Sequence, residues 1–256
     1  MKIATYNVNS VNARLPVLLK YLKEDQPDVV CLQELKAIDE NFPIDAIKEA
    51  GYNAIWFGQK AWNGVAILSK HEIELVRKGL PGDPEDLHSR YIEAIVNGIL
   101  ICCLYLPNGN PAPGPKYDYK LKWMERLHQH AKELRTYKLP VVITGDFNVI
   151  PEELDAYKPE NWVNDALFLP ETRKAFQDLK ADYWIDAIRH KFPKGTIYTY
   201  WDYFRGAFSR NAGIRIDHFL VSPQLKDRIG MVGVNKDVRS WEKTSDHAPV
   251  WIELVD

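Results

Sequence analysis

Short apolar runs, each bounded by turn-forming residues, recur along the whole chain. Runs of this length that are rich in valine, isoleucine and aromatic residues are typical of β-strands. The predicted strands are Lys2 to Val8, Asp28 to Gln33, and the runs that begin at Asn53, Gly64, Tyr91, Ile99, Pro140, Arg215 and Ala248.

Apolar positions spaced three to four residues apart predict helices at Ala13 to Asp25 and at Asp118 to Tyr137. A third helix is expected to begin near Pro170. His128 and His130 of the second helix are expected on the surface. The apolar face of that helix contains Leu121, Met124, Leu127, Ala131 and Leu134.

The predicted strands outnumber the helices, and several of them are adjacent, as in hairpins. This order is unlike that of an open parallel sheet. It favours an α/β fold in which two mixed sheets pack face to face and are covered by helices. The longest irregular stretches are Asn108 to Tyr117 and Arg205 to Gly213, and neither resembles a linker. One domain is therefore expected over residues 1–256.

The composition is that of an ordinary globular protein, with 256 residues of which 46% are hydrophobic and 27% charged. No run of about 18 uncharged apolar residues exists, so no membrane span is expected. Cys31, Cys102 and Cys103 lie inside apolar strand-like runs and predict buried thiols. The N-terminus lacks a secretory signal, so a reducing cytoplasm is the expected location.

The formal net charge of −2 argues against a protein that only coats nucleic acid, but it allows a local basic surface. Tyr203 to Arg215, YFRGAFSRNAGIR, carries three arginines, three aromatic residues and no acid. This mixture suits a loop that contacts phosphates and bases, and Arg210 is a candidate for such a contact. A solvated loop without a ligand explains the same composition.

Polar residues stand at the ends of five predicted strands, where a buried run meets a loop. They are Asn7; Glu34; Tyr105 with Asn108; Asp146 with Asn148; and the group Ser245, Asp246 and His247 before the last strand. If these strand ends face the same side of the sandwich, carboxylates, amides, a phenol and a histidine converge there.

Each of these positions also has a purely structural explanation. Glu34 could begin a helix, and Asn7 could form an Asx turn. Asp146 with Asn148 could close a tight loop, and the residues before the last strand could cap it. His218 is expected to be structural. Five independent coincidences are harder to explain in this way than any single one.

The same residues suit phosphodiester hydrolysis by water. An oxygen ligand such as Glu34 suits Mg²⁺, and Asp146 can accept a proton from the attacking water. Asn148 can hold that water or a phosphate oxygen. His247, oriented by Asp217, can stabilise developing negative charge. No serine or cysteine nucleophile is required.

The ordered set of motifs resembles the exonuclease III family of apurinic/apyrimidinic (AP) endonucleases, within the endonuclease/exonuclease/phosphatase superfamily. The motifs are TYNVNSVNARL, VVCLQELK, GVAILSK, YLPNGN, KLKWMERL, GDFNVIP, YTYWDY, RNAGIRIDHFLVS and SDHAPVW, and they run from Lys2 to the C-terminus. GVAILSK and KLKWMERL are weak alone, whereas QE, GDFN, RIDHFL and SDH in this order are highly specific.

The resemblance implies a four-layer α/β sandwich and a role for each strand-end residue. It implies that Glu34 is the main metal ligand beside Asn7, with Asp246 near the metal. It further implies that Asp146 activates the water and Asn148 positions it. The remaining implied roles are phosphate contacts by Tyr105 and Asn108, and stabilisation of the pentacovalent state by His247 with support from Asp217.

The resemblance also implies a small apolar pocket for a flipped-out abasic sugar, formed by Tyr200, Ile214 and Ile216. The two isoleucines are aliphatic where relatives can use an aromatic residue. The NPAPGP segment replaces loops that contact DNA in some relatives, so no DNA-binding role is assigned to it. Asn164 to Phe176 lies where family members differ in substrate preference.

The leading hypothesis is a Mg²⁺-dependent enzyme, with Mn²⁺ as a possible substitute, that cleaves double-stranded DNA 5′ to abasic sites. Additional 3′-phosphatase, 3′-phosphodiesterase and 3′→5′ exonuclease activities are expected, and the protein is expected to be a monomer. One alternative is an enzyme that mainly processes blocked 3′ ends. Others are a phosphodiesterase for lipid headgroups and a catalytically silent nucleic-acid-binding regulator.

Overall fold

The computed structural model describes residues 1–255 and contains two six-stranded sheets. The first sheet has the order β11 (Ile229–Val234), β12 (Val250–Leu254), β1 (Lys2–Asn7), β2 (Val29–Gln33), β4 (Val65–Ser69) and β3 (Asn53–Phe57). The second has the order β5 (Glu74–Lys78), β6 (Tyr91–Val96), β7 (Ile99–Tyr105), β8 (Val141–Asp146), β10 (Asp217–Val221) and β9 (Ile185–Asp186).

Both sheets are mixed. β1 pairs with β2 in parallel and β7 pairs with β8 in parallel, whereas the other pairs are antiparallel. The prediction of two mixed sheets is therefore confirmed. The sequence pattern missed β5, β9 and β11. β5 is a largely exposed edge strand, β9 has only two residues, and β11 contains two glycines that interrupt its apolar pattern.

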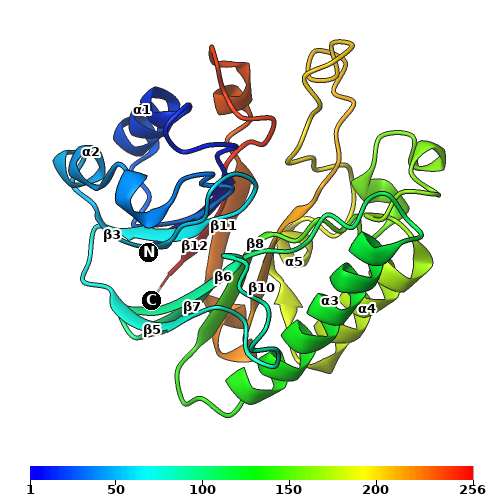
Figure 1. The fold of residues 1–256 in the computed structure, drawn as a ribbon, viewed down its shortest axis with the longest axis horizontal. Coiled ribbons are helices and arrows are strands. Elements are labelled where there is room, and N and C mark those ends of the chain that lie inside the picture. The colour runs from blue at the N-terminus through cyan, green and yellow to red at the C-terminus, as the bar shows by residue number, and fades with distance from the viewer. Residues whose placement is uncertain (256) are drawn as a thin grey trace.

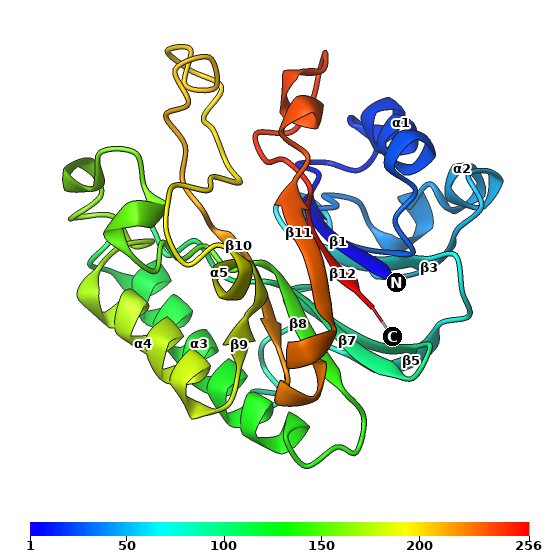
Figure 2. The ribbon, with the colours of Figure 1, turned by 180° about the vertical axis from the view of Figure 1, so that it is seen from behind.

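The two sheets pack face to face, and helices cover their outer faces (Figures 1 and 2). α1 (Leu15–Asp25) and α2 (Ile44–Glu49) lie on the first sheet. α3 (Pro115–Leu134) and α4 (Pro170–Asp182) lie on the second, and the short α5 (Ala187–Lys191) follows β9. The 3₁₀ turns are Asp39–Asn41, Glu153–Asp155, Pro159–Asn161, Pro223–Arg228 and Lys236–Ser240.

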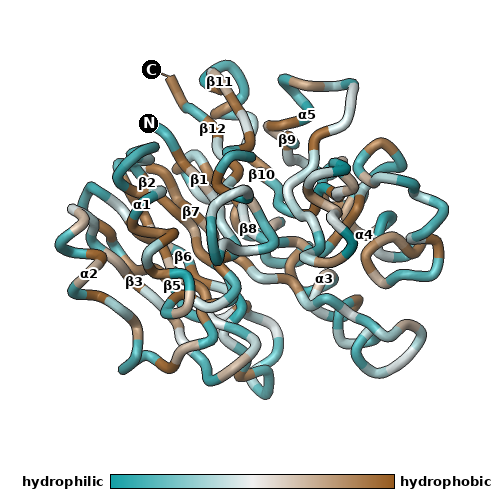
Figure 3. The backbone as a smooth tube through the Cα atoms, turned by 90° about the horizontal axis from the view of Figure 1, so that it is seen from above, coloured by the Kyte–Doolittle hydropathy of each residue, from teal (hydrophilic) through white to brown (hydrophobic). Residues whose placement is uncertain are grey.

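The core between the sheets consists of branched aliphatic side chains from both inner faces. Cys31 and Cys103 belong to this layer, and Cys102 points into the layer beneath α3. All three are free and buried, as predicted. Apolar residues concentrate on the strands and polar residues on the surrounding loops (Figure 3). Among residues 1–255, no helix is long and apolar enough to cross a membrane.

The long helix α3 begins three residues before its predicted start because Pro115 occupies the first turn, where a missing N–H costs nothing. Trp123 and Leu127 are fully buried, and each such side chain contributes about 1.5–3 kcal/mol. The prediction that His130 lies on the surface is wrong. His130 is buried, and its Nε2 contacts the carboxylate of Glu93 in β6.

Candidate active site

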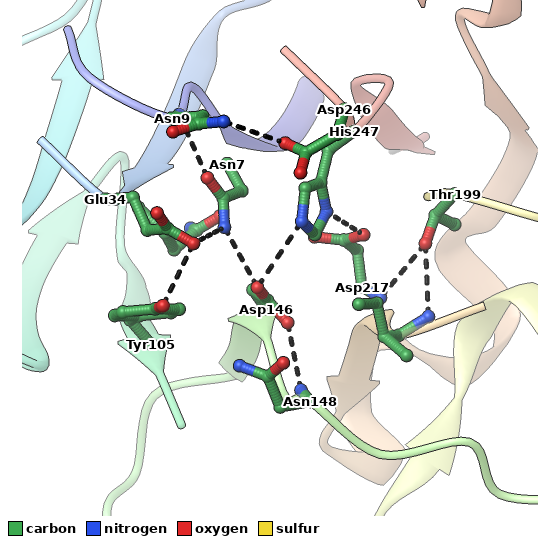
Figure 4. A network of polar contacts seen from close by, with 12 residues as sticks. Asn7, Asn9, Glu34, Tyr105, Asp146, Asn148, Thr199, Asp217, Asp246 and His247 are labelled. Carbon is green, nitrogen blue, oxygen red and sulfur yellow. Dashed lines mark hydrogen bonds and ion pairs between the residues drawn. The ribbon is translucent and has the colours of Figure 1, made fainter. Parts of the chain in front are cut away.

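The ends of the central strands meet at one edge of the two sheets. Strand register alone places Asp146 beside both Tyr105 and Asp217, because β8 pairs with β7 on one side and with β10 on the other. Asn7, at the end of β1 in the opposite sheet, lies at the same edge, since its side chain hydrogen-bonds to Asp146. The fold thus brings residues distant in sequence together (Figure 4).

Asn7 joins the two sheets through its side-chain amide. Its Nδ2 donates to Glu34 Oε1 at 2.9 Å and to Asp146 Oδ2 at 2.9 Å. Its Oδ1 accepts from the backbone N–H of Asn9, which fixes the orientation of the amide. Asn7 is fully buried, so these bonds hold two carboxylates from different sheets at a set separation.

Glu34 lies just beyond β2 in a left-handed backbone conformation, with φ 54°, and no helix begins there. Its Oε1 accepts from the Tyr105 hydroxyl at 2.9 Å, and its Oε2 lies 2.9 Å from the ammonium of Lys36. Burial disfavours the Glu34 carboxylate. The hydrogen bond from Asn7 and the charge of Lys36 outweigh that effect and hold the pKa of Glu34 below its ordinary value.

Sequence reasoning missed Lys36 and Asn9, although both lie within quoted motifs. The Lys36 ammonium also donates to Asn9 Oδ1 at 2.7 Å. Asn9 Nδ2 in turn donates to Asp246 Oδ1 at 3.2 Å. A chain of polar contacts therefore runs from Glu34 to Asp246 along one rim of the site. The available signal was a lysine only two residues after Glu34 in the chain.

Asp146 is buried at the end of β8, and its Oδ1 accepts from the backbone N–H of Asn148 at 2.9 Å. Asn148 has φ 48°, and its side chain donates to Leu106 O at 2.8 Å. Burial raises the pKa of Asp146 to about 7, partly opposed by the charge of His247 and reinforced by Asp217. The turn therefore holds both polar side chains in place, and burial brings the pKa of one of them, Asp146, close to neutral pH.

His247 forms a buried pair with Asp217, at 2.9 Å between Nδ1 and Oδ2. Its Nε2 lies 3.7 Å from Asp146 Oδ2. Burial would lower the pKa of His247, but the carboxylates of Asp217 and Asp146 outweigh it and raise that pKa to about 10. The ring is therefore an imidazolium at neutral pH, with one N–H directed at Asp217 and the other toward Asp146.

The acidic cluster formed by Glu34, Asp146, Asp217 and Asp246 contains four carboxylates, and two cations, Lys36 and His247, form ion pairs with them. Ligand atoms of Asp146, Asp217 and His247 lie within 4.8 Å of one another. Such an excess of oxygen donors fits a hard divalent cation, and Glu34 and Asp246, with Asn7 between Glu34 and Asp146, could help to hold it. His247 fits poorly as a ligand because its Nδ1 is hydrogen-bonded to Asp217 and its Nε2 faces Asp146.

Asn108 and Asn148 meet on the other rim of the cluster, where Asn108 Nδ2 donates to Asn148 Oδ1 at 3.3 Å. The Tyr200 ring lies over the opposite side, 5.1 Å from the His247 ring. Ser245 also lies there, since its hydroxyl donates to Asn7 O at 2.6 Å. Every strand-end residue predicted for the site thus lies in or beside the acidic cluster.

Ile214 and Ile216, predicted to line a sugar pocket with Tyr200, lie beside the cluster but are almost completely covered. Only 1% and 3% of their surfaces are exposed. They belong to one apolar group with Leu167 and Phe168, and Tyr200 packs against this group. Leu167 and Phe168 belong to Asn164 to Phe176, the segment predicted to affect substrate preference, so this segment supplies part of the cover over the predicted pocket.

Arg210 lies apart from the acidic cluster, on the exposed loop between Tyr203 and Gly213. Its Nε donates to Arg205 O. Both arginines border a groove of about 830 Å³ that Trp162 and Phe204 also line. The loop thus exposes two arginines and Phe204, as its composition predicts, and Asp165 and Asp202 also line the groove.

Arg215 does not belong to that exposed surface, in contrast to the expectation from composition. It is buried, and it donates to Asp155 Oδ1 at 2.7 Å and to Asp186 Oδ2 at 2.9 Å. His218 is structural, as predicted: it is fully buried and contacts Arg215 and the carbonyl of Val149.

Comparison with known proteins agrees with this architecture. Residues 4–247 match the endonuclease/exonuclease/phosphatase family. The chain belongs to this family. It is 37% identical to the exodeoxyribonuclease III of Haemophilus influenzae, over 99% of this chain and 100% of the relative.

Two solved structures of family members superpose closely. An AP endonuclease from Archaeoglobus fulgidus has a TM-score of 0.96 and 36% identity, with complete coverage of both chains. The 3′ phosphatase NExo from Neisseria, solved with a product DNA hairpin, has a TM-score of 0.96 and 38% identity, again with complete coverage. The protein is therefore a metal-dependent phosphodiester hydrolase of the exodeoxyribonuclease III type.

Proposed function

We propose that the protein is a Mg²⁺-dependent DNA-repair enzyme that hydrolyses the backbone of double-stranded DNA on the 5′ side of abasic sites. The products are a 3′-hydroxyl and a 5′-deoxyribose phosphate. The observation that supports this most directly is the acidic cluster, which Asn7 holds together across two sheets. Mn²⁺ can replace Mg²⁺, and the enzyme acts as a monomer in the cytoplasm.

In this proposal Asp146 accepts the proton of the attacking water. A pKa of about 7 makes Asp146 a base of suitable strength at neutral pH. Asn148 holds the water through its side-chain amide, and the backbone N–H of Asn148 orients the Asp146 carboxylate. The bound cation would neutralise charge on the phosphate.

His247 stabilises the negative charge that develops on the phosphate oxygens. Its imidazolium is already fixed by Asp217, so no reorganisation is required during the reaction. Tyr105 and Asn108 contact the scissile phosphate from the other rim. Glu34 is the main cation ligand, and its donors Asn7 and Tyr105 hold it in place.

A second candidate function is the removal of blocking groups from 3′ ends, with little cutting inside a strand. The coverage of Ile214 and Ile216 favours it, because a sugar can enter the predicted pocket only if neighbouring side chains move. The high similarity to a 3′ phosphatase supports the same candidate. Both functions use the same acidic cluster.

The test uses two labelled duplexes, one with an internal abasic-site analogue and one ending in a 3′-phosphate. Each is incubated with the protein in Mg²⁺ or in EDTA. Asp146→Asn is the inactivating variant, and Asp118→Asn, on the exposed face of α3, is the matched control.

Rapid internal cutting that requires metal, and that Asp146→Asn abolishes, supports the AP endonuclease. Removal of the 3′-phosphate without internal cutting supports the second candidate. If neither duplex is changed and a phospholipid headgroup is released in a parallel assay, both DNA functions are wrong. Metal-independent binding of DNA without cleavage would instead indicate a silent regulator.

A further inference from the structure

A lysine is completely buried beneath the loops that carry the two active-site amides. Lys120 projects from α3, and none of its surface is exposed. Its Nζ donates to the backbone carbonyl of Asn108 at 3.0 Å and to that of Asn148. One ammonium therefore binds the loop after β7 and the turn after β8 from below, while the side chains of Asn108 and Asn148 meet above.

The lysine side chain has room because the neighbouring residue, Gly109, has no side chain. Gly109 has φ +90°, and a Cβ added there would lie 2.6 Å from Lys120 Cδ. Any other residue at position 109 would press against the lysine and would also strain the backbone. The loop conformation and the path of Lys120 are therefore matched to each other.

The charge on Lys120 is costly in this position. Burial lowers the pKa of Lys120 to about 7, opposed by the carboxylates of Asp146 and Asp165 and assisted by the nearby Arg90. A buried ammonium without a direct ion pair usually destabilises a fold. Two carbonyl groups could be satisfied more cheaply by a neutral amide or a water molecule. This cost suggests that Lys120 contributes to activity as well as to packing.

We propose that Lys120 is a positioning residue for hydrolysis, which fixes the Asn108 and Asn148 amides relative to Asp146 by binding the backbone carbonyls of both loops. The proposal rests on the proposed function, since it assumes that these amides contact the phosphate and the water. Lys120 itself touches neither. Its loss should leave substrate binding largely intact and slow the chemical step.

The main test compares Lys120→Met with the wild type on whichever duplex the wild type processes faster, at saturating Mg²⁺. We expect kcat to fall about 10- to 100-fold while KM changes less than about threefold. Lys120→Arg keeps the charge and the donors and should recover most of the lost kcat. Lys122→Met, on the exposed face of α3, is the matched control and should behave like the wild type.

Two further variants test whether Lys120 acts through the amides. Gly109→Ala should lower kcat in the same way because it displaces the lysine. In an Asn148→Ala background, Lys120→Met should cause much less than its usual loss, since the group that it positions is already absent. Additive losses, a change confined to KM, or an unchanged kcat would overturn the proposal.

Hydrogen exchange provides a readout that does not depend on activity. Amides at 106–110 and 146–149 should exchange faster in Lys120→Met than in the wild type, with little change elsewhere in the second sheet. If the wild type cleaves no DNA yet these amides respond, the proposed function fails while Lys120 still holds the loops. If the amides do not respond, the Lys120 proposal fails.

Discussion

Two buried groups of charges lie close together in this protein and differ in their balance. The balanced cluster consists of Arg215 and Arg189 with Asp155 and Asp186, so two cations face two carboxylates. The acidic cluster has four carboxylates, and only two cations, Lys36 and His247, form ion pairs with them among the described residues.

The pKa values reflect this difference. Burial disfavours the carboxylates of Asp155 and Asp186, but Arg215 outweighs burial and holds both pKa values below their ordinary range. At Asp146 burial prevails, and the pKa rises to about 7. Charges that the fold compensates stay fixed and support structure. Charges that it leaves uncompensated remain available for a cation and for proton transfer.

The largest effect expected from the acidic cluster is the loss of activity in Asp146→Asn. The amide cannot accept the proton of water, so we expect hydrolysis of DNA to fall about 10⁴-fold or more. Stability should stay constant or rise, because one uncompensated carboxylate has been removed. Steady-state cleavage and urea unfolding measure the two effects. A large loss of stability would show that Asp146 is structural.

The balanced cluster should respond in the opposite way. Arg215→Met leaves two carboxylates buried with fewer partners, and we expect the free energy of unfolding to fall by about 3–5 kcal/mol. The fraction of Arg215→Met protein that remains folded should keep most of the wild-type activity. Urea unfolding with an activity assay below the transition measures both. A stable but inactive Arg215→Met protein would contradict the assigned roles.

His218, which contacts Arg215 of the balanced cluster, should make the free energy of unfolding depend on pH. Burial, together with Arg215, lowers the pKa of His218 to about 3 from its ordinary value of 6.5. Between these values the unfolded chain binds a proton that the folded protein excludes. Stability should therefore fall as the pH drops from about 6.5 toward 3, by up to about 4 kcal/mol.

His218→Gln removes the titrating group and should flatten this slope between pH 6.5 and 4. His71→Gln is the control, since the His71 side chain is 40% exposed. Asp155 and Asp186 add to acid instability only below about pH 4, because their folded pKa values are lowered. Urea unfolding at several pH values tests the slope, and an unchanged slope in His218→Gln would refute its assignment.

The smallest effect expected at the acidic cluster is that of Tyr105→Phe. It removes the hydroxyl that donates to Glu34 and leaves the ring in place. We expect kcat/KM to fall about tenfold, since one oriented donor is lost. Steady-state kinetics on the same duplex measure this. A loss as large as that of Asp146→Asn would mean that Tyr105 takes part in proton transfer.

Much of the site could be predicted from sequence because its residues stand where strands end. Asp146, Asn148 and Glu34 follow apolar runs, and parallel strands bring such ends to one edge. The two mixed sheets could also be predicted, because most strands are long apolar runs. The edge strands β5 and β11 lack that signal.

The remaining features depend on partners that only the folded chain supplies. In sequence Arg215 resembles its exposed neighbour Arg210, but in the fold it is buried because Asp155 and Asp186 balance its charge. His130 similarly needs Glu93. The sequence did indicate that Lys120 is unusual, because this charged residue lies on the largely apolar face of α3. Its two backbone acceptors, however, could not be identified from the sequence.

Divalent-cation binding by the acidic cluster is the most direct test of this account. Mn²⁺ binding is followed by electron paramagnetic resonance for the wild type, Glu34→Gln and Arg215→Met, in the absence of DNA. We expect Glu34→Gln to weaken binding about 10- to 100-fold and Arg215→Met to leave it unchanged. Equal binding by the wild type and Glu34→Gln would show that the uncompensated carboxylates do not hold the metal.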